Sequence, residues 1–319
     1  MAPQLPSATS VFFGGGTPSL VPAGLLTSVL NAIPRTPEAE VTVECNPDTV
    51  TPELFAAYRA AGVTRVSLGV QSMVPHVLEA LGRTHDPQNV RRSVDIAREI
   101  GFESFNVDLI YGGAGESLHD WRRTLEEALD LEPPHVSAYG LTVEPGTPLA
   151  DDTARHPDDD DQADKYAMAT DMFAAAGLQW YEISNWSRPG HECRHNHLYW
   201  SQGEYLGVGC AAHSHRDGRR WWNVRTPERY IDAIEQSRSP EAGSECLGEE
   251  ERAIEALQLA LRTAAGVPAD ALPADDELVD LVTPDGHGRV VLTLKGRLLA
   301  NEVALRLRQP GATAGSTIT

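Results

Sequence analysis

The chain has 319 residues and a formal net charge of −20 at pH 7, from 46 Asp and Glu against 26 Lys and Arg. This length suits one large domain with an appendage, or two domains. The acidic excess argues against a nucleic-acid backbone or an anionic membrane surface as partner, because both require clustered Lys and Arg. No apolar stretch approaches the length of a bilayer span, and Met1-Ala2-Pro3-Gln4 lacks the features of a signal peptide, so we expect a cytoplasmic protein.

The chain begins with an apolar run that ends in three glycines, VFFGGGTP at residues 11–18. We read this run as a buried strand, because a helical pattern follows from about residue 22. Three successive glycines allow backbone N–H groups to approach a ligand closely. The loop would then lie at the carboxyl end of a strand, where α/β folds place their ligands. The alternative is a plain tight turn.

Short β-rich runs and amphipathic segments alternate along the first half of the chain. The β-rich runs lie at residues 40–44, 65–70, 105–110 and 135–141, and helical patterns follow at 52–60, 89–99 and 118–129. With the opening strand they make five β/α units spaced by roughly thirty residues, as right-handed parallel crossovers require. Residues 1–150 are therefore predicted to form an α/β barrel or part of one.

The pattern changes after residue 149, and we place a barrel extension at 151–245. Residues 151–164 hold seven aspartates, typical of a solvated loop that enters a helix, here predicted at 162–176. A strand is predicted at 179–183. An irregular segment rich in His, Trp, Tyr and Gly follows at 185–223, and we expect it to carry chemistry or a ligand.

The last part of the chain is predicted to be a small helical or winged module at 246–308. It combines a helix at 249–261, a β-like run at 289–294 and a helix at 295–307. A role in stability or interaction is expected for it. Residues 309–319 are predicted to form an unordered tail.

Polar side chains recur on successive predicted strands: Glu44 and Gln71 lie at the ends of the second and third strands, and Asp108 lies in the fourth. Glu44, Gln71 and Asp108 would project toward the same mouth of a barrel as the glycine loop. Each alone could be a turn-former, but their recurrence favours a binding site. Arg83 could clamp a carboxylate there, although by itself it would be read as a surface arginine.

Seven motifs occur in an order that resembles a known family: GGGTPS, ECNPD, RVSLGVQS, GRTH, NVDLIYG, YGLTVEPGTPL and YEISNWSRPG followed by CRHNHLYW. Together they resemble the radical S-adenosylmethionine proteins related to oxygen-independent coproporphyrinogen III oxidase, over residues 9–308. The run from His195 to Trp200 matches the HNxxYW signature of the HemW-like haem-chaperone branch. The resemblance implies an incomplete (β/α)6 radical SAM barrel with a small carboxyl-terminal module.

The resemblance also implies an S-adenosylmethionine site at the barrel mouth, formed by Gly15, Gly16, Thr17, Glu44, Gln71, Arg83, Asp108 and Gly140. The glycine loop would contact the amino-acid part of S-adenosylmethionine. The two carboxylates would accept hydrogen bonds from its ribose or ammonium, and Gln71 and Arg83 would hold its carboxylate. Gly140 would leave room for adenine.

One departure concerns the iron–sulfur cluster of this family. Its members carry a CxxxCxxC loop before the GGGTP strand, and those thiolates hold a 4Fe–4S cluster. Here about ten residues precede that strand and none is cysteine, while Cys45, Cys193, Cys210 and Cys246 are too scattered to replace the loop or to form a disulfide framework. We interpret the chain as truncated, without the first β/α unit and unable to bind the cluster. A cluster-free derivative that retains a haem-handling role is the alternative.

The segment around His195 has two interpretations. Cys193, His195 and His197 alternate, so in an extended chain they would share one face, although their close spacing disfavours a tetrahedral zinc site. We prefer His195 as an axial haem ligand, ahead of His197 or Cys193. In the alternative, His195 and Asn196 hydrogen-bond the barrel floor while Tyr199 and Trp200 pack into its core. His213 and His215 are lesser candidates.

Two classes of function follow from the resemblance. The first is a haem chaperone that binds haem and transfers it to apo-haemoproteins such as respiratory enzymes, with S-adenosylmethionine and the cluster in a regulatory or dimer-forming role. The second is oxygen-independent oxidation of coproporphyrinogen III in porphyrin biosynthesis, in which a deoxyadenosyl radical abstracts a propionate hydrogen. The HNxxYW segment favours the first class. The acceptor apoprotein and a homodimer are left open.

Overall fold

A computed structural model of the chain describes residues 6–309. The chain divides into two compact units, and the first ends at His195 while the second begins at Asn196. The predicted tail lies outside the described residues from 310 onward, as do the first residues weighed against a signal peptide. The finer predicted boundaries at 150, 245 and 308 stay predictions. Among the described helices, none is both long and apolar enough to cross a membrane.

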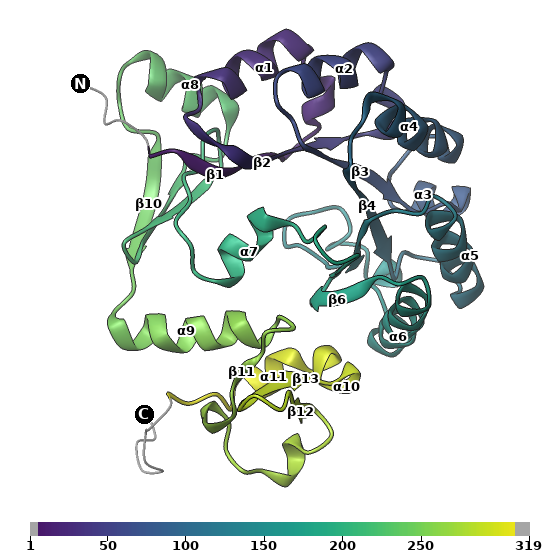
Figure 1. The fold of residues 1–319 in the computed structure, drawn as a ribbon, viewed down its shortest axis with the longest axis vertical. Helices are drawn as coiled ribbons and strands as arrows, with labels where there is room; N and C mark the ends of the chain where they lie inside the picture. The colour runs from purple at the N-terminus through teal and green to yellow at the C-terminus, as the bar shows by residue number, and fades with distance from the viewer. Residues whose placement is uncertain (1–5, 310–319) are drawn as a thin grey trace. The chain divides into compact units, whose positions relative to one another are not determined.

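The first unit contains a curled seven-stranded sheet with the order β1-β2-β3-β4-β5-β7-β6 (Figure 1). The first five strands run parallel: β1 (Ala8–Phe13), β2 (Arg35–Cys45), β3 (Arg65–Gln71), β4 (Ser104–Tyr111) and β5 (His135–Gly140). They confirm the predicted series of β/α units. Two short strands, β7 (Asn185–Ser187) and β6 (Gln179–Glu182), extend the sheet with antiparallel pairing. A further β/α unit before β1 stays a prediction.

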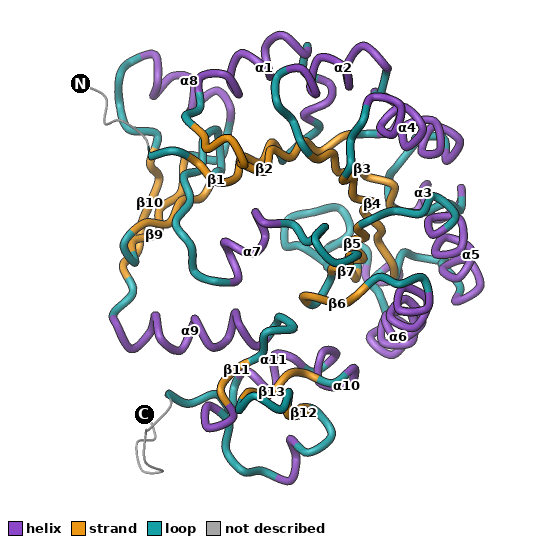
Figure 2. The backbone as a smooth tube through the Cα atoms, in the orientation of Figure 1, coloured by secondary structure: helices purple, strands orange, loops and turns teal. Residues whose placement is uncertain are grey.

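Six helices of this unit lie along the outer side of the sheet (Figure 2): α1 (Ala23–Ala32), α2 (Pro52–Ala60), α3 (Pro75–Ala80), α4 (Pro87–Ile100), α5 (Leu118–Leu129) and α6 (Asp159–Ala175). Capping residues close in the sequence determine where several of these helices begin. The Thr51 hydroxyl accepts from Leu54 N at 3.1 Å, and Ser117 forms a capping box with Asp120. Helices α2 and α5 therefore have the predicted bounds. In the aspartate-rich run, Asp158 caps α6, which confirms the solvated helix entry.

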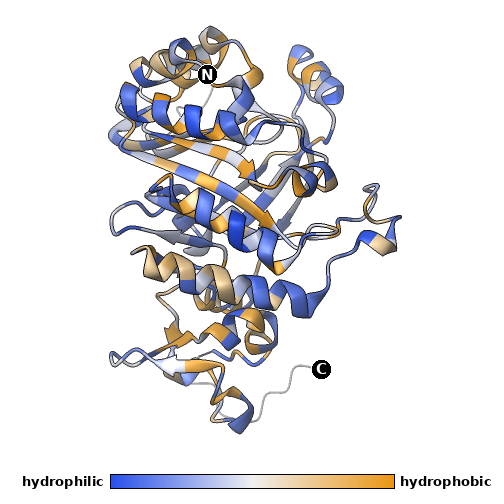
Figure 3. Cartoon of the chain, turned by 90° about the vertical axis from the view of Figure 1, so that its right-hand side faces the viewer, coloured by the Kyte–Doolittle hydropathy of each residue, from blue (hydrophilic) through white to orange (hydrophobic). Residues whose placement is uncertain are grey.

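Apolar strand residues are buried on the helix-facing side of the sheet, and polar residues alternate with them on the inner side. Val66, Leu68 and Val107 are fully buried, as are Phe55 and Leu125 on the helices. Helices with one hydrophilic and one hydrophobic face cover the sheet (Figure 3). This alternation places the side chains that can perform chemistry on the concave side of the curled sheet.

The second unit contains two small antiparallel sheets and several helices. The sheets are β10-β9-β8, from β8 (His213–Arg216), β9 (Arg219–Asn223) and β10 (Glu241–Cys246), and β11-β13-β12, from β11 (Val267–Pro268), β12 (Val282–Pro284) and β13 (Arg289–Leu292). The helices are α8 (Pro227–Glu235), α9 (Glu249–Leu261), α10 (Leu294–Leu298) and α11 (Ala300–Ala304). Helix α7 (Arg194–Trp200) begins at the end of the first unit. Single 3-10 turns occur at Pro18–Leu20, Pro47–Thr49, Thr153–Arg155, Ala269–Ala271 and Asp276–Leu278.

Two predicted elements of this part are wrong in detail. The segment 185–223, predicted to be irregular, contains β7, α7, β8 and β9, because its aromatic residues pair across strands, as in the stacking of His213 on Trp222. The single helix predicted at 295–307 is divided at Leu299, whose φ of −111° and ψ of 28° leave the helical region. Gly296 packs so closely on the Leu281 carbonyl that a Cβ would lie 1.9 Å from its oxygen. Such long-range packing overrides local helix propensity.

Candidate functional site

The glycine loop after β1 requires glycine at each of its three positions. Gly15 and Gly16 have φ of +80° and +62°, in the left-handed region. A Cβ at Gly14 would lie 2.6 Å from the Phe12 ring and 3.2 Å from Glu44 Cδ. The Gly15 N–H donates to Glu44 Oε2 at 3.1 Å. The loop therefore folds onto the end of β2, at the carboxyl ends of the parallel strands as predicted, and Thr17 follows it directly.

Two carboxylates lie on the inner face near this loop. Asp108 accepts hydrogen bonds from the Ser67 hydroxyl at 2.7 Å and from Asn106 Nδ2 at 2.7 Å. Burial raises the pKa of Asp108, and these hydrogen bonds oppose the rise. Burial also raises the pKa of Glu44, the Gly15 N–H lowers it, and the charge of Asp108 raises it further. When ionised, both carboxylates are acceptors only, so together they suit a group that carries N–H or O–H donors.

The strand register explains why these groups meet. Glu44 pairs with Ser67, Ser67 with Asn106, and Asn106 with His135, so these four form one row across the sheet. A second row contains Gly69, Asp108, Ser137 and Asn185. Asn106, Ser137, His135 and Asn185 were missed as site residues in the sequence. The signal that could have found them is the spacing of two residues in Asn106 and Asp108 and in His135 and Ser137.

Gln71 lies at an irregularity of β3. The register shifts between Gly69 and Gln71, and Gln71 has a φ of +63°, which is uncommon for a residue with a side chain. A Cβ at Gly69 would lie 3.0 Å from Gln71 Nε2, so the Gln71 amide folds back over the row that contains Asp108. Backbone strain of this kind is typical of functional sites.

The other two predicted site residues differ in their surroundings. A Cβ at Gly140 would lie 3.3 Å from Oε1 of Gln162, a residue of α6 whose Nε2 donates to the Leu141 carbonyl at 3.0 Å. Gln162 therefore borders the candidate site at Gly140, and the sequence did not indicate this residue. Arg83 lies exposed in the loop between α3 and α4, and among the described residues its guanidinium makes no hydrogen bond or ion pair. In this conformation Arg83 forms no ion pair with Glu44 or Asp108 among the described residues, and its role stays a prediction.

His195 is held against β1 and β2. Its Nδ1 lies 2.8 Å from the Ser10 hydroxyl, and its ring stacks on Phe12 with centroids 5.0 Å apart. Its backbone N–H donates at 3.0 Å to Oε1 of Glu40, which is 6% exposed. Burial lowers the pKa of His195, so the imidazole is neutral near pH 7. A neutral imidazole with one oriented nitrogen is suited to bind a metal.

Two expectations for the neighbours of His195 are wrong. The segment is helical from Arg194, so His195 and His197 lie about 200° apart around the helix axis and cannot share the face expected of an extended chain. Tyr199 is 41% exposed and contacts the edge of Tyr205, so it does not pack into a core. The contacts of His195 with Ser10 and Glu40 agree with one part of the alternative interpretation, in which His195 forms hydrogen bonds to the barrel.

The cysteines do not form a cluster site in the described part of the chain. Burial raises the pKa of the Cys45 thiol, which lies 3.5 Å from the Val43 carbonyl oxygen. Buried Cys193 has its Sγ 3.6 Å from Glu40 Oε1. Across residues 6–309, no three His, Cys, Asp or Glu side chains are grouped so that they could hold a metal ion. Because a cluster requires several thiolates, these residues do not fit one.

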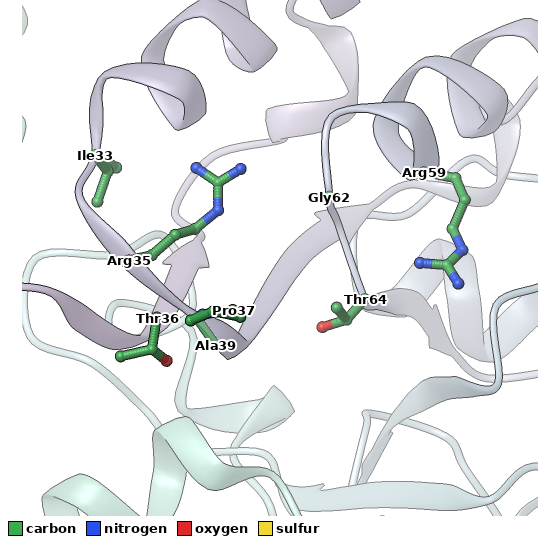
Figure 4. Close-up of a pocket in the computed structure, with 8 residues that line it drawn as sticks. All are labelled: Ile33, Arg35, Thr36, Pro37, Ala39, Arg59, Gly62 and Thr64. Carbon is green, nitrogen blue, oxygen red and sulfur yellow. The ribbon is translucent and has the colours of Figure 1, made fainter.

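A hollow lies at the amino-terminal ends of β2 and β3, away from the glycine loop. It is lined by Ile33, Arg35, Thr36, Pro37, Ala39, Arg59, Gly62 and Thr64 (Figure 4). Arg35 donates to the carbonyls of Leu30 at 2.7 Å and Ala61 at 3.0 Å. Its guanidinium therefore satisfies the carboxyl-terminal ends of α1 and α2. These contacts give Arg35 a structural role, apart from the glycine loop.

Comparisons with known proteins identify sequences that are similar to this chain. Residues 3–128 match the Radical SAM superfamily. A protein of Mycobacterium tuberculosis (strain ATCC 25618 / H37Rv) named "Heme chaperone HemW" is 43% identical over 316 residues, covering 95% of this chain and 81% of that protein. Proteins of the same name from Escherichia coli (strain K12) and Bacillus subtilis (strain 168) are 39% and 34% identical, over 73% and 93% of this chain and 65% and 85% of their own lengths.

Among solved structures, the coproporphyrinogen III oxidase (HemN) from Escherichia coli superposes with a TM-score of 0.80 at 21% identity. The match covers 93% of this chain and 77% of that chain. At this level of identity the likeness shows a shared fold and nothing about activity. The curled sheet with its outer helices is therefore a radical SAM fold.

Proposed function

The chain belongs to the HemW family of radical SAM proteins, and from this premise we propose that it is a haem chaperone, which binds haem and transfers it to haem-free acceptor proteins. The observation that carries the proposal is the setting of His195 within the HNxxYW segment. Its imidazole is neutral, stacked on Phe12 and oriented by Ser10. The oxidase alternative shares the fold of HemN, but no feature of the described site favours that activity over haem binding.

Haem is the cargo in this proposal, and His195 is its axial ligand. The Ser10 hydroxyl at Nδ1 orients the ring of His195, and Glu40 fixes the backbone at the start of α7. Haem iron accepts a neutral imidazole. A histidine ligand can be replaced by a ligand of the acceptor protein, as transfer requires. We propose haemoproteins of the respiratory chain as acceptors and the cytoplasm as the place of transfer.

We also propose that the barrel mouth binds S-adenosylmethionine. Glu44 and Asp108 fit its ammonium or ribose hydroxyls, the glycine loop from Gly15 to Thr17 fits its amino-acid part, and the cradle over Gly140 borders its adenine. Gln71, and Arg83 after movement of its exposed side chain, would hold its carboxylate. When bound beside a 4Fe–4S cluster, S-adenosylmethionine supplies a deoxyadenosyl radical. The described residues do not fit that cluster.

Haem titration of the full chain and two variants tests the chaperone proposal. His195→Ala is expected to weaken haem binding by about tenfold or more and to change the Soret band, because a metal-ligand bond is lost. His287→Ala, which removes an exposed histidine of the second unit, should leave both unchanged. Transfer of haem from the loaded chain to apomyoglobin is followed by its absorbance. Equal affinity and spectra for His195→Ala and the wild type would exclude His195 as the ligand.

Binding of S-adenosylmethionine is tested separately by equilibrium dialysis with the radiolabelled compound. Glu44→Ala is expected to reduce the bound fraction, because it removes an acceptor at the glycine loop. Glu38→Ala, an exposed carboxylate of the same strand, is the matched control. Retention by Glu44→Ala of the wild-type bound fraction would contradict this part of the proposal. Size-exclusion chromatography with and without haem measures whether the chain forms a homodimer.

A further inference from the structure

A buried histidine, His135, lies at the centre of a chain of polar side chains in the first unit. His135 itself is not among the proposed haem or S-adenosylmethionine contacts. His135 begins β5 and is 1% exposed. Its Nδ1 lies 2.6 Å from Asn106 Oδ1, and its Nε2 lies 2.7 Å from the Tyr181 hydroxyl. Both ring nitrogens are therefore within hydrogen-bond distance of a partner on a different strand.

The chemistry of these partners determines the direction of each hydrogen bond. The Asn106 amide nitrogen donates to Asp108 Oδ1 at 2.7 Å, so Asn106 Oδ1 is an acceptor and His135 Nδ1 must carry the hydrogen. Burial, with the charges of Arg65 and His191, lowers the pKa of His135, so the ring is neutral. Its Nε2 then accepts from the Tyr181 hydroxyl.

The other end of this chain reaches the segment that presents His195. The Tyr181 oxygen accepts from the backbone N–H of Cys193 at 3.3 Å, two residues before His195. Arg65 Nη1 donates to the His191 carbonyl at 2.9 Å and so attaches the same segment to β3. Residues 191–195 are thus joined to the sheet through Arg65 and Tyr181, in addition to the contacts that His195 makes with β1 and β2. Of these links, the one through Tyr181 depends on the orientation of His135.

We propose that His135 is a positioning residue: as a neutral Nδ1–H tautomer it holds Tyr181, and through Tyr181 the segment 191–195, in the geometry that presents His195 to haem. It acts through its neighbours and does not touch haem. The haem part of the inference rests on the proposed function. The same chain ends at Asp108, so the proposed haem ligand and a proposed contact of S-adenosylmethionine share one support.

Histidine is suited to this position because one of its two partners accepts a hydrogen bond and the other donates one. It donates through Nδ1 to an oxygen and accepts through Nε2 from a hydroxyl, at a separation set by the ring. Leu would remove the donor to the Asn106 oxygen and the acceptor for the hydrogen of the Tyr181 hydroxyl. Gln can reach one of these partners with an amide, so it should restore part of the function.

The tautomer is tested directly by NMR of the chain labelled with 15N-histidine, in which long-range couplings distinguish the two ring nitrogens. His135 is expected to show a protonated Nδ1 and an unprotonated Nε2 at pH 7. His135→Gln identifies its signals. An imidazolium or an Nε2–H tautomer would reverse the direction of the Tyr181 hydrogen bond and overturn the proposal.

Two matched tyrosine variants test the positioning. Tyr181→Phe removes the link to Cys193, whereas Tyr166→Phe removes another buried hydroxyl, which donates to the Ile183 carbonyl at 2.8 Å. Tyr181→Phe is expected to accelerate hydrogen exchange of the 191–195 amides, and to weaken haem binding, by about threefold to tenfold each. Tyr166→Phe should leave both close to the wild type. Equal effects of the two variants would contradict the positioning role.

Rescue separates positioning from general loss of packing. His135→Leu should show the fast exchange and weak haem binding of Tyr181→Phe together with a broadened Soret band, and His135→Gln should recover part of all three. Absence of any difference between Leu and Gln would overturn the inference. If His195→Ala retains haem binding, the proposed ligand is wrong. The exchange measurements on the haem-free chain would still decide whether His135 holds the segment.

Discussion

The imidazole Nδ1 of His195 and the hydroxyl of Ser10 lie 2.8 Å apart, although the two residues are 185 positions apart in the chain. Ser10 belongs to β1, the strand that continues into the glycine loop. Phe12 of the same strand stacks on His195, and a Cβ at Gly14 would strike the Phe12 ring. One strand therefore supports both the proposed haem ligand and the proposed S-adenosylmethionine loop.

Ser10→Ala is predicted to weaken haem binding by about threefold to tenfold, because the imidazole loses the hydrogen bond that orients it. The effect should be smaller than that of His195→Ala, which removes the ligand itself. Ser28→Ala in α1 removes an exposed hydroxyl that donates to the Leu25 carbonyl and serves as the control. Spectroscopic haem titration measures all three. An affinity of Ser10→Ala equal to that of the control would show that Ser10 does not orient the ligand.

Gly14→Ala is predicted to lower the free energy of unfolding by about 1–3 kcal/mol, because the added methyl group overlaps the Phe12 ring and approaches Glu44. Gly24→Ala is the matched change, since a Cβ at that position of α1 meets no atom within 4 Å. It should leave stability unchanged or raise it by up to about 1 kcal/mol, because alanine favours helix. Urea unfolding compares the variants. Equal stability of the two would mean that the loop has space for a side chain.

The free energy of unfolding is predicted to fall as the pH decreases below about 6.5, the usual pKa of histidine. Burial lowers the pKa of His135, His195 and His85 in the folded chain. Below pH 6.5 the unfolded chain therefore binds protons that the folded chain does not, and this continues until the pH reaches the lower folded-state values. Each histidine contributes at most about 1.4 kcal/mol per pH unit.

Comparison of variants isolates one histidine from the carboxyls, which act in the opposite direction because burial raises the pKa of Glu44 and Asp108. The slope of unfolding free energy against pH between 6.5 and 5 should be shallower for His135→Gln than for the wild type. His287→Gln, at an exposed site, should retain the wild-type slope. Identical slopes for all three would show that His135 titrates alike in the folded and unfolded chains.

Lys165→Met is predicted to destabilise the chain by about 3–5 kcal/mol, because it leaves a buried carboxylate without its cation. Lys165 and Glu116 have fully buried side chains, and Lys165 Nζ lies 3.3 Å from Glu116 Oε2. Adding Glu116→Gln removes the unpaired charge and keeps an acceptor for Gly112 N, so the double variant should recover part of the loss. Thermal unfolding of the wild type, the two single variants and the double variant completes this double-mutant cycle. Additive losses would mean that the two side chains do not interact.

The boundaries of α2 and α5 could be predicted because each depends on a cap within its own first turn, Thr51 and Ser117. The parallel strands could be predicted for a similar reason, since their apolar runs and spacing are written along the chain. The helix at Arg194 and the strands β8 and β9 were not predicted, because local composition suggested a loop. Contacts of His195 with β1 and β2 hold the start of that helix, and these contacts come from distant segments. Strands β8 and β9 instead form a local hairpin around Asp217 and Gly218, which both have positive φ, so the Asp-Gly pair is a hairpin signal that the aromatic composition obscured.

The same distinction between local sequence and distant contacts applies to the candidate site. The amino-acid sequence by itself determined the glycine loop, the carboxylates Glu44 and Asp108 on their strands, and the motifs that indicate the family, because these depend on residue type and short spacing. Only the tertiary structure decided that Ser10 and Glu40 hold His195 and that His135 joins Asn106 to Tyr181. Those contacts depend on strand register and on the return of distant segments to the sheet, which no local pattern in the chain encodes.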